Sequence, residues 1–210
     1  MKKQPKIILA SNLTSLIKYG YELTGIPKDE MRIGYVTTAA LASSDISWFE
    51  EVRNKIIAGG HNFEEIDIAD KTPEQILDFF KDKNIIHIEG GNTFYLLKAV
   101  RETGFAGILK HLLDEGMVYM GTSAGSYIMC PNIEVAGWKV GRNKFGLTDF
   151  TALNYVPFVL KAHYTDDMRS EVMAHTGELG CPLRILRDGE CIMSDESGIK
   201  FFGDNPETVI

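Results

Sequence analysis

The sequence predicts an α/β fold: a doubly wound, mostly parallel sheet with helices on both faces and an antiparallel meander at the C-terminus. Over the first 130 residues, short apolar runs alternate with segments of helical spacing. Such runs, bounded by turn residues, are typical of buried parallel strands. The last 30 residues instead carry short strand-like runs separated by turn signals. The chain has 210 residues and no long linker or repeat, so we expect one domain over residues 1–210.

The predicted parallel strands are short segments rich in apolar residues that are bounded by turn signals. We expect these strands at residues 6–10, 31–38, 63–68, 84–88 and 117–121. Between them, apolar residues recur at three- and four-residue steps, which is the spacing of one helix face. The clearest helix start is the Thr-Pro-Glu-Gln segment at residues 72–75, a capping box with proline at the first helical position.

The C-terminal meander is predicted from three short runs, at residues 184–186, 191–193 and 199–202. Asp188 and Gly189 between the first two are a hairpin turn signal. We expect residues 194–198 to turn the next pair. The three strands would then join the sheet in antiparallel order.

Composition and charge limit the partners that we expect. Lys and Arg number 22 against 29 Asp and Glu, a net charge of −7, which argues against nucleic acid because phosphate binding favours a basic face. Three widely spaced cysteines without a C-x-x-C pair predict neither a disulfide framework nor a zinc site. No apolar run is long enough for a signal peptide or a membrane span. We therefore expect a cytoplasmic protein without a metal.

The segment with the most chemical information is Gly-Thr-Ser-Ala-Gly at residues 121–125, which follows the fifth predicted strand. It matches G-x-S-x-G, the nucleophile elbow, in which a sharp turn exposes the serine hydroxyl at the carboxyl edge of the sheet. The turn also directs the backbone N–H of Ala124 toward the position of Ser123, where an oxyanion would form. The alternative is a glycine-rich turn that binds an anion or only reverses the chain.

A second glycine turn, at Gly90 and Gly91, follows the fourth predicted strand and precedes a helix that Asn92 can cap. Ligands of open α/β sheets bind outside the carboxyl ends of neighbouring strands, so both turns are expected to face one crevice. The N–H of Gly91 can then pair with that of Ala124 as an oxyanion hole. The alternative is a close helix–strand approach that has no room for a Cβ atom.

A serine nucleophile needs a base, and the chain has five histidines. His163 is the best candidate, because it lies downstream of the elbow at the end of an apolar run, in the chain order of elbow hydrolases. The others are expected in a loop, inside a strand or on helices: His61, His87, His111 and His175.

Together these residues resemble the peptidase E family of aspartyl dipeptidase-like serine peptidases, which are related to the cyanophycinases. The resemblance covers most of the chain. Residues 8–12 resemble the opening strand, residues 90–97 the glycine turn and helix, and residues 121–125, followed by Cys130 and Pro131, the nucleophile segment. It implies a fold similar to class I glutamine amidotransferases, with serine in place of cysteine. It also implies a Ser123 nucleophile, a His163 base and oxyanion N–H groups from Gly91 and Ala124, without a cofactor.

The sequence departs from the family pattern at the third member of the triad. The typical acid stands fifteen residues after the serine, where this chain has Trp138. An indole N–H donates and cannot accept a proton from an imidazole N–H, so we expect Trp138 to line the pocket. Glu134, Asp149 or a backbone carbonyl then takes the third role, or the enzyme works as a dyad.

The second departure concerns substrate binding. The family uses an arginine downstream of its histidine to hold an aspartyl side chain, and Arg169 is the nearest match here, after a deletion. A guanidinium suits a carboxylate, but Arg169 can equally be a solvent-facing helix residue beside Asp166. Arg169 and Asn92 are the candidate substrate-binding residues.

We expect a serine peptidase of short peptides, with Asp-X dipeptides as one candidate substrate class. The first alternative is an esterase or amidase of small molecules that uses the same groups. The second is a catalytically silent relative that binds a peptide or metabolite. The sequence leaves the oligomeric state open.

Overall fold

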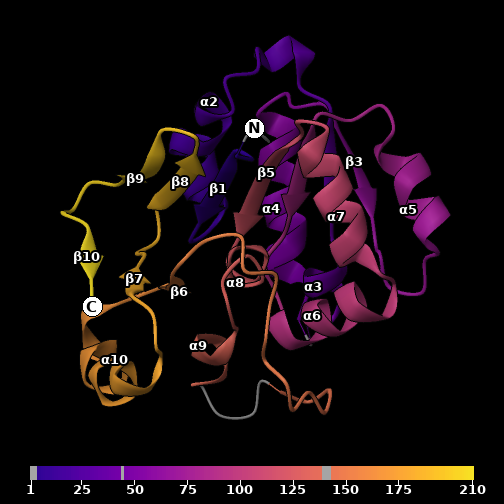
Figure 1. Ribbon diagram of the computed structural model, residues 1–210. Helices are drawn as coiled ribbons and strands as arrows, with labels where there is room; N and C mark the ends of the chain where they lie inside the picture. Colours follow the sequence, from indigo (N-terminus) through magenta and orange to yellow (C-terminus); the bar gives the residue numbers. More distant parts are fainter. Residues whose placement is uncertain (1–3, 44, 139–142) are drawn as a thin grey trace.

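The computed structural model describes residues 4–43, 45–138 and 143–210 (Figure 1). Five strands lie where the apolar runs predicted them: β1 (Ile7–Ala10), β2 (Ile33–Val36), β3 (Phe63–Ile66), β4 (Ile85–Ile88) and β5 (Val118–Thr122). They pair in parallel in the order β3-β2-β4-β5-β1. β8 (Cys191–Asp195) and β9 (Gly198–Phe202) extend the sheet beyond β1 in antiparallel pairs.

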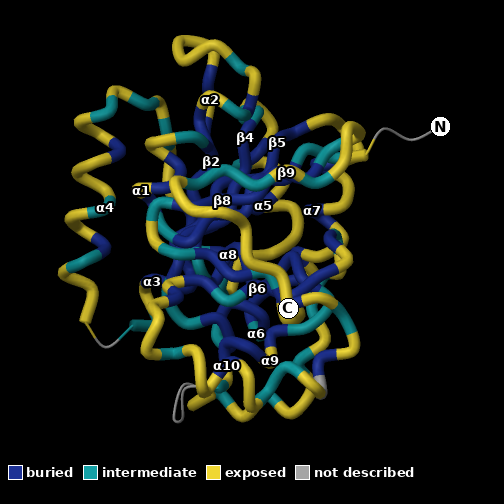
Figure 2. Tube along the Cα trace, turned by 90° about the vertical axis from the view of Figure 1, so that its left-hand side faces the viewer, coloured by how far each residue is buried: buried dark blue, intermediate teal, exposed yellow. Residues whose placement is uncertain are grey.

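Helices cover both faces of the sheet, which confirms the predicted fold class. Along β1, Ile7 and Leu9 pack into one core, while Ile8 and Ala10 pack into another, because successive side chains of a strand point to opposite faces. Helices α5 (Pro73–Phe80), α6 (Thr93–Glu102) and α7 (Phe105–Asp114) bury side chains in the first core. α1 (Leu13–Ser15) and α4 (Ser47–Ala58) cover the second, and Figure 2 shows α4 and α7 on opposite sides of the strands.

Two helices begin as the sequence predicts. The Thr72 side chain accepts from the N–H of Gln75 and the Gln75 side chain accepts from that of Thr72, so the capping box of α5 is complete. The Asn92 side chain accepts from two N–H groups at the start of α6. The other α-helices are α2 (Tyr21–Leu23), α3 (Thr38–Leu41), α8 (Ala124–Tyr127), α9 (Glu134–Gly137) and α10 (Arg169–His175). A π-helical segment, η1 (Leu16–Gly20), joins α1 to α2, and three 3₁₀ turns occur at η2 (Lys28–Glu30), η3 (Asp166–Met168) and η4 (Thr176–Glu178).

The C-terminal prediction is wrong in one respect. β7 (Leu183–Ile185) does not join the main sheet but lies in a small sheet between β6 (Val159–Lys161) and β10 (Thr208–Val209), below β8 and β9 in Figure 1. Asp188 and Gly189 do form a tight turn, with the Glu190 N–H donating to the Arg187 carbonyl at 3.1 Å. This turn connects two sheets instead of closing a hairpin, because β7 pairs in parallel with β6. Only β8 and β9 form the predicted antiparallel pair on the main sheet.

Among the described residues, no helix has the length and apolar character needed to cross a bilayer.

Candidate active site

The turn between β5 and α8 holds Ser123 in a conformation that is rare for any residue but glycine, with φ 45° and ψ −102°. A non-glycine residue in such a region costs about 1–3 kcal/mol, and such strain is concentrated at functional sites. The two flanking glycines make the turn possible. A Cβ on Gly121 would lie 2.6 Å from the carbonyl carbon of Gly125, and one on Gly125 would overlap the Ile88 carbonyl oxygen.

The second glycine turn lies directly against the first. A Cβ on Gly90 would stand 3.2 Å from the Cβ of Ser123. Gly91 has φ 134°, and a Cβ there would overlap the Ala39 carbonyl oxygen. Within the described part of the chain, the N–H groups of Gly91 and Ala124 donate to no protein acceptor. The fold, over its described residues, therefore does not use either of these two N–H groups as a hydrogen-bond donor.

A cavity of about 660 Å³ opens above these turns and brings most of the predicted site together. Ser123, Gly91, Asn92 and His163 all line it. The other described lining residues are Ser11, Asn12, Leu13, Ala42, Ser43, Trp48, Val52, Glu89, Gly90, Thr122, Lys144 and Phe145.

The His163 ring has a carboxylate partner that the sequence analysis did not identify. His163 Nδ1 lies 2.7 Å from Asp188 Oδ1. The buried Ser11 joins the pair, because its hydroxyl donates to Asp188 Oδ1 at 2.8 Å and accepts from the His163 N–H at 2.9 Å. These contacts hold His163 at φ 55°, a second strained backbone position in the site.

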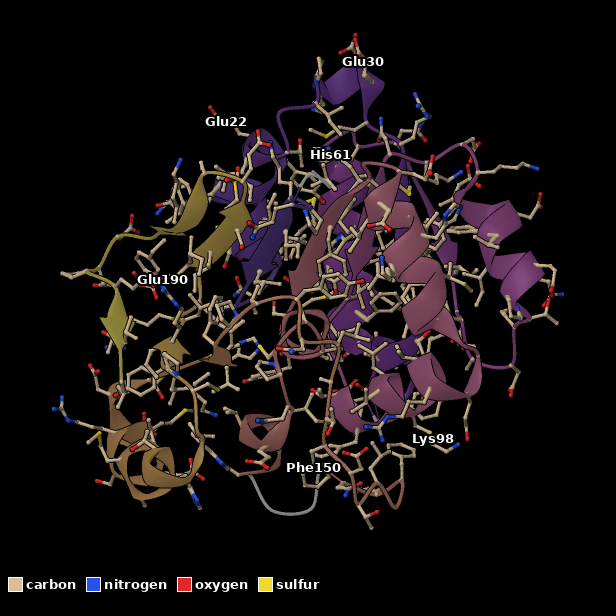
Figure 3. All side chains as sticks on the ribbon, viewed as in Figure 1. Glu22, Glu30, His61, Lys98, Phe150 and Glu190 are labelled. Atoms are coloured by element: carbon tan, nitrogen blue, oxygen red, sulfur yellow. The ribbon has the colours of Figure 1, made fainter. Side chains whose placement is uncertain are left out.

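Asp188 is presented by the turn between β7 and β8. The Glu190 side chain accepts from the Arg187 N–H at 2.7 Å, a hydrogen bond that links the two ends of the turn. The Ser11 N–H donates to the Glu190 carbonyl at 3.1 Å, which fixes the turn to the carboxyl end of β1. Figure 3 labels Glu190 at the start of β8. The same figure labels His61, which lies at the opposite end of the sheet.

The pairing determines the proton positions on His163. The hydrogen bond from His163 and a second one from Ser11 favour the ionised carboxylate, so the pKa of Asp188 is lowered although partial burial opposes the shift. An ionised carboxylate can only accept. Neutral His163 therefore carries its proton on Nδ1, and its Nε2 is the acceptor. This is the tautomer that a general base needs.

None of the three residues considered for the third position contacts His163. Trp138 ends α9 and stacks on His175, with ring centroids 5.1 Å apart, so it does not line the cavity as expected. Asp149 pairs with Arg101 at 3.2 Å, and Glu134 is exposed in the first turn of α9. Asp188 was missed because it stands 25 residues after His163 in a dipeptide that also predicts a turn.

The two candidate substrate-binding residues have different surroundings. Asn92 lines the cavity while its side-chain oxygen accepts from the N–H groups of Phe94 and Tyr95, both at 3.0 Å. Arg169 is exposed at the start of α10 and is absent from the described lining. Nothing in the arrangement therefore directs Arg169 toward Ser123.

A buried carboxylate that sequence reasoning passed over joins the two glycine turns. Glu89 Oε1 accepts from the Thr122 hydroxyl at 2.5 Å and from the Gly90 N–H at 2.6 Å. Its Oε2 accepts from the Tyr35 hydroxyl at 2.5 Å. His87 Nε2 lies 3.8 Å away, but burial lowers the pKa of His87 to about 4, so that ring is neutral near pH 7. Glu89 thus connects the end of β4 to the residue before Ser123.

Glu89→Gln is expected to lower the free energy of unfolding by about 1–3 kcal/mol. The glutamine amide places an NH₂ donor where a carboxylate oxygen of Glu89 accepts, so one of the groups that donate to Glu89 loses its acceptor. Urea unfolding measures the change. Glu102→Gln, at an exposed position paired with Lys98 on α6, is the control and should stay within about 0.5 kcal/mol of wild type. Equal effects of the two substitutions would contradict a structural role for the Glu89 network.

Comparisons with known proteins identify the family to which this chain is similar. The model of peptidase family S51 matches residues 11–202 of the chain. An uncharacterised peptidase of Pasteurella multocida is 30% identical over 162 residues, which are 77% of this chain and 78% of that protein. A peptidase E of Nostoc is 28% identical over 185 residues, which cover 82% of this chain and 70% of that protein.

Solved structures share the fold. A crystal structure described as a candidate peptidase E from Listeria monocytogenes superposes with a TM-score of 0.80 at 22% identity, covering 96% of this chain and 99% of its own. A peptidase from an acI-B1 actinobacterium has a TM-score of 0.69 at 14% identity, covering 100% of this chain and 95% of its own.

Proposed function

Because the chain belongs to peptidase family S51, we propose that it is a serine peptidase of short peptides in which Ser123 is the nucleophile and His163 the general base. Membership in the family confirms the resemblance to peptidase E and makes the chain a peptidase. The observation that carries the proposal is the strained Ser123, which shares one cavity with a His163 ring paired to Asp188.

The proposed reaction follows from the positions of the donors and acceptors. Ser123 Oγ attacks the peptide carbonyl carbon while its proton passes to His163 Nε2. The N–H groups of Gly91 and Ala124 stabilise the oxyanion. The proton then moves to the amine nitrogen as the C–N bond breaks. Water attacks the acyl-enzyme by the same path, which releases the acid and returns the proton to Ser123.

The Asp188 contact also bears on the two alternatives. The proposal of a catalytically silent relative rested on Trp138 at the third position. A carboxylate on His163 Nδ1 removes that reason, because it supplies the orientation that the indole cannot. An esterase would use the same groups, so substrates distinguish it from a peptidase.

A fluorophosphonate probe tests the nucleophile directly. We expect folded wild-type protein to lose fluoride from the probe as Ser123 Oγ bonds to phosphorus, with the adduct found on the Ser123 peptide by mass spectrometry. A panel of dipeptides should be hydrolysed by the same preparation, and a chelator should leave the rate unchanged. An unlabelled protein, or an adduct on another residue, would rule out this mechanism. Hydrolysis of activated esters without any dipeptide would favour the esterase.

A further inference from the structure

We propose that the acyl-side residue of the substrate is apolar, and that it binds against a wall formed by Ala42, Trp48 and Val52, here called the α4 wall. This inference rests on the proposed function, since it concerns which peptide reaches Ser123. All three residues line the cavity that contains Ser123. Trp48 and Val52 stand one turn apart on α4 and therefore point to the same side of the helix.

The strand order places this wall on the acyl side. The order β2-β4-β5-β1 puts Ser123, after β5, between the segment that follows β2 and the His163 site beside β1. His163 must deliver a proton to the leaving amine, so the leaving group lies on the β1 side of Ser123. The acyl residue then points toward β2, where α3 ends and α4 begins. That is the position of the α4 wall.

The charges around the cavity disfavour an aspartyl side chain. The only cationic side chain in the described lining is Lys144, and its neighbour Phe145 packs on Tyr95 of α6, at 4.9 Å between ring centroids. Lys144 therefore reaches the cavity from the side of α6, whereas α4 covers the other face of the sheet. The cation thus lies away from the α4 wall, where the acyl residue would bind.

Glu89 is the acidic residue of the described lining, and it follows β4, which lies between β5, the strand before Ser123, and β2, on the side of the α4 wall. A substrate carboxylate brought beside Glu89 would meet a like charge. Arg169 is absent from the described lining. An apolar side chain instead replaces water on Trp48 and Val52, which are both half-buried beside the core that α4 covers.

Diphenyl aminophosphonates with Leu, Phe, Ala or Asp side chains test the proposal. Ser123 Oγ bonds to phosphorus and phenol leaves, so the labelling rate reports binding of the side chain next to the reacting atom. We expect the Leu and Phe probes to label at least about 10-fold faster than the Asp probe, which is the discrimination that a hydrophobic pocket supplies. An Asp probe that labels as fast as the Phe probe would overturn the inference.

Two variants and one control identify the wall. Trp48→Ala should slow the Phe probe about 10-fold and leave the Ala probe within about 2-fold. Val52→Lys should raise the rate of the Asp probe relative to the Phe probe, because it adds a cation to the wall. Ile57→Ala, on the same helix but 55% exposed and outside the described lining, is the control and should change neither rate.

The outcomes separate this inference from the proposed function. If Trp48→Ala slows all probes equally, the α4 wall does not select the side chain, whereas the serine mechanism stands. If a simple fluorophosphonate fails to label Ser123 in wild type, the serine mechanism itself is wrong. If the fluorophosphonate labels Ser123 and the four aminophosphonates react equally, the cavity does not select by side chain, and the inference alone fails.

Discussion

Ser123→Gly is expected to abolish hydrolysis while making the protein more stable. A lost nucleophile in a serine peptidase costs about 10⁶-fold in kcat. At φ 45° and ψ −102°, Ser123 is strained, and glycine adopts such a conformation without a Cβ penalty. The relief of about 1–3 kcal/mol is partly offset by the greater freedom of glycine in the unfolded chain. We therefore expect a net gain of about 1 kcal/mol.

Ser123→Ala is the matched control, because it removes the same hydroxyl and keeps the Cβ that makes the turn strained. Both variants should lose activity and fluorophosphonate labelling, but only Ser123→Gly should unfold at a higher denaturant concentration. Urea unfolding of the three proteins measures the difference. If both variants are equally stable, the backbone at Ser123 stores no strain, and the stability cost of the site lies elsewhere.

Asp188→Asn is expected to lower kcat by about 10⁴-fold, the loss seen when the acid of a serine protease triad becomes an amide. An asparagine amide can donate to His163 Nδ1, which would move the ring proton to Nε2 and remove the acceptor that Ser123 needs. KM should change much less than kcat, because Asp188 does not line the cavity described for the substrate. Steady-state kinetics on one cleaved dipeptide separates the two constants.

Asp149→Asn and Trp138→Ala are the matched controls for Asp188→Asn. Asp149 pairs with Arg101 and Trp138 stacks on His175, so neither substitution should lower kcat by more than a few-fold. A large loss in one of these variants, with Asp188→Asn near wild type, would show that another residue orients His163.

The Asp188 carboxyl also links stability to pH. Its pKa is lowered in the folded protein by the hydrogen bond from His163 and by that from Ser11. The folded state therefore binds fewer protons at this site than the unfolded chain does. The resulting stability is present above the unfolded pKa, about 3.9, and is lost as the pH falls through the lower folded value. Asp188→Asn should reduce the pH dependence of unfolding in that acid range.

Local sequence patterns were sufficient for the main sheet and for half of the site. The central parallel strands are buried on both faces and appear as continuous apolar runs, as at β1 and β4, whereas the edge strand β3 exposes Glu64 and Glu65. The two glycine turns were also predictable, because Gly91 and Gly125 stand where a Cβ would overlap a backbone oxygen. Glycine is the residue type that fits such close backbone approaches, so these positions are visible in the sequence although Ala39 and Ile88, the residues approached, are distant in the chain.

The tertiary structure alone determined the partner of His163 and the shape of the cavity. Asp188 reaches His163 only because β7 pairs with β6 and leaves the main sheet, and no local pattern encodes that pairing. Trp48 and Val52 look like the core face of any amphipathic helix, yet the fold turns them toward Ser123. Chain segments distant in sequence meet there, and their contacts depend on how the whole chain packs. The nucleophile turn and its strand were therefore predictable from the amino-acid pattern, whereas the carboxylate on His163 and the side chains around Ser123 follow from the packing of distant segments.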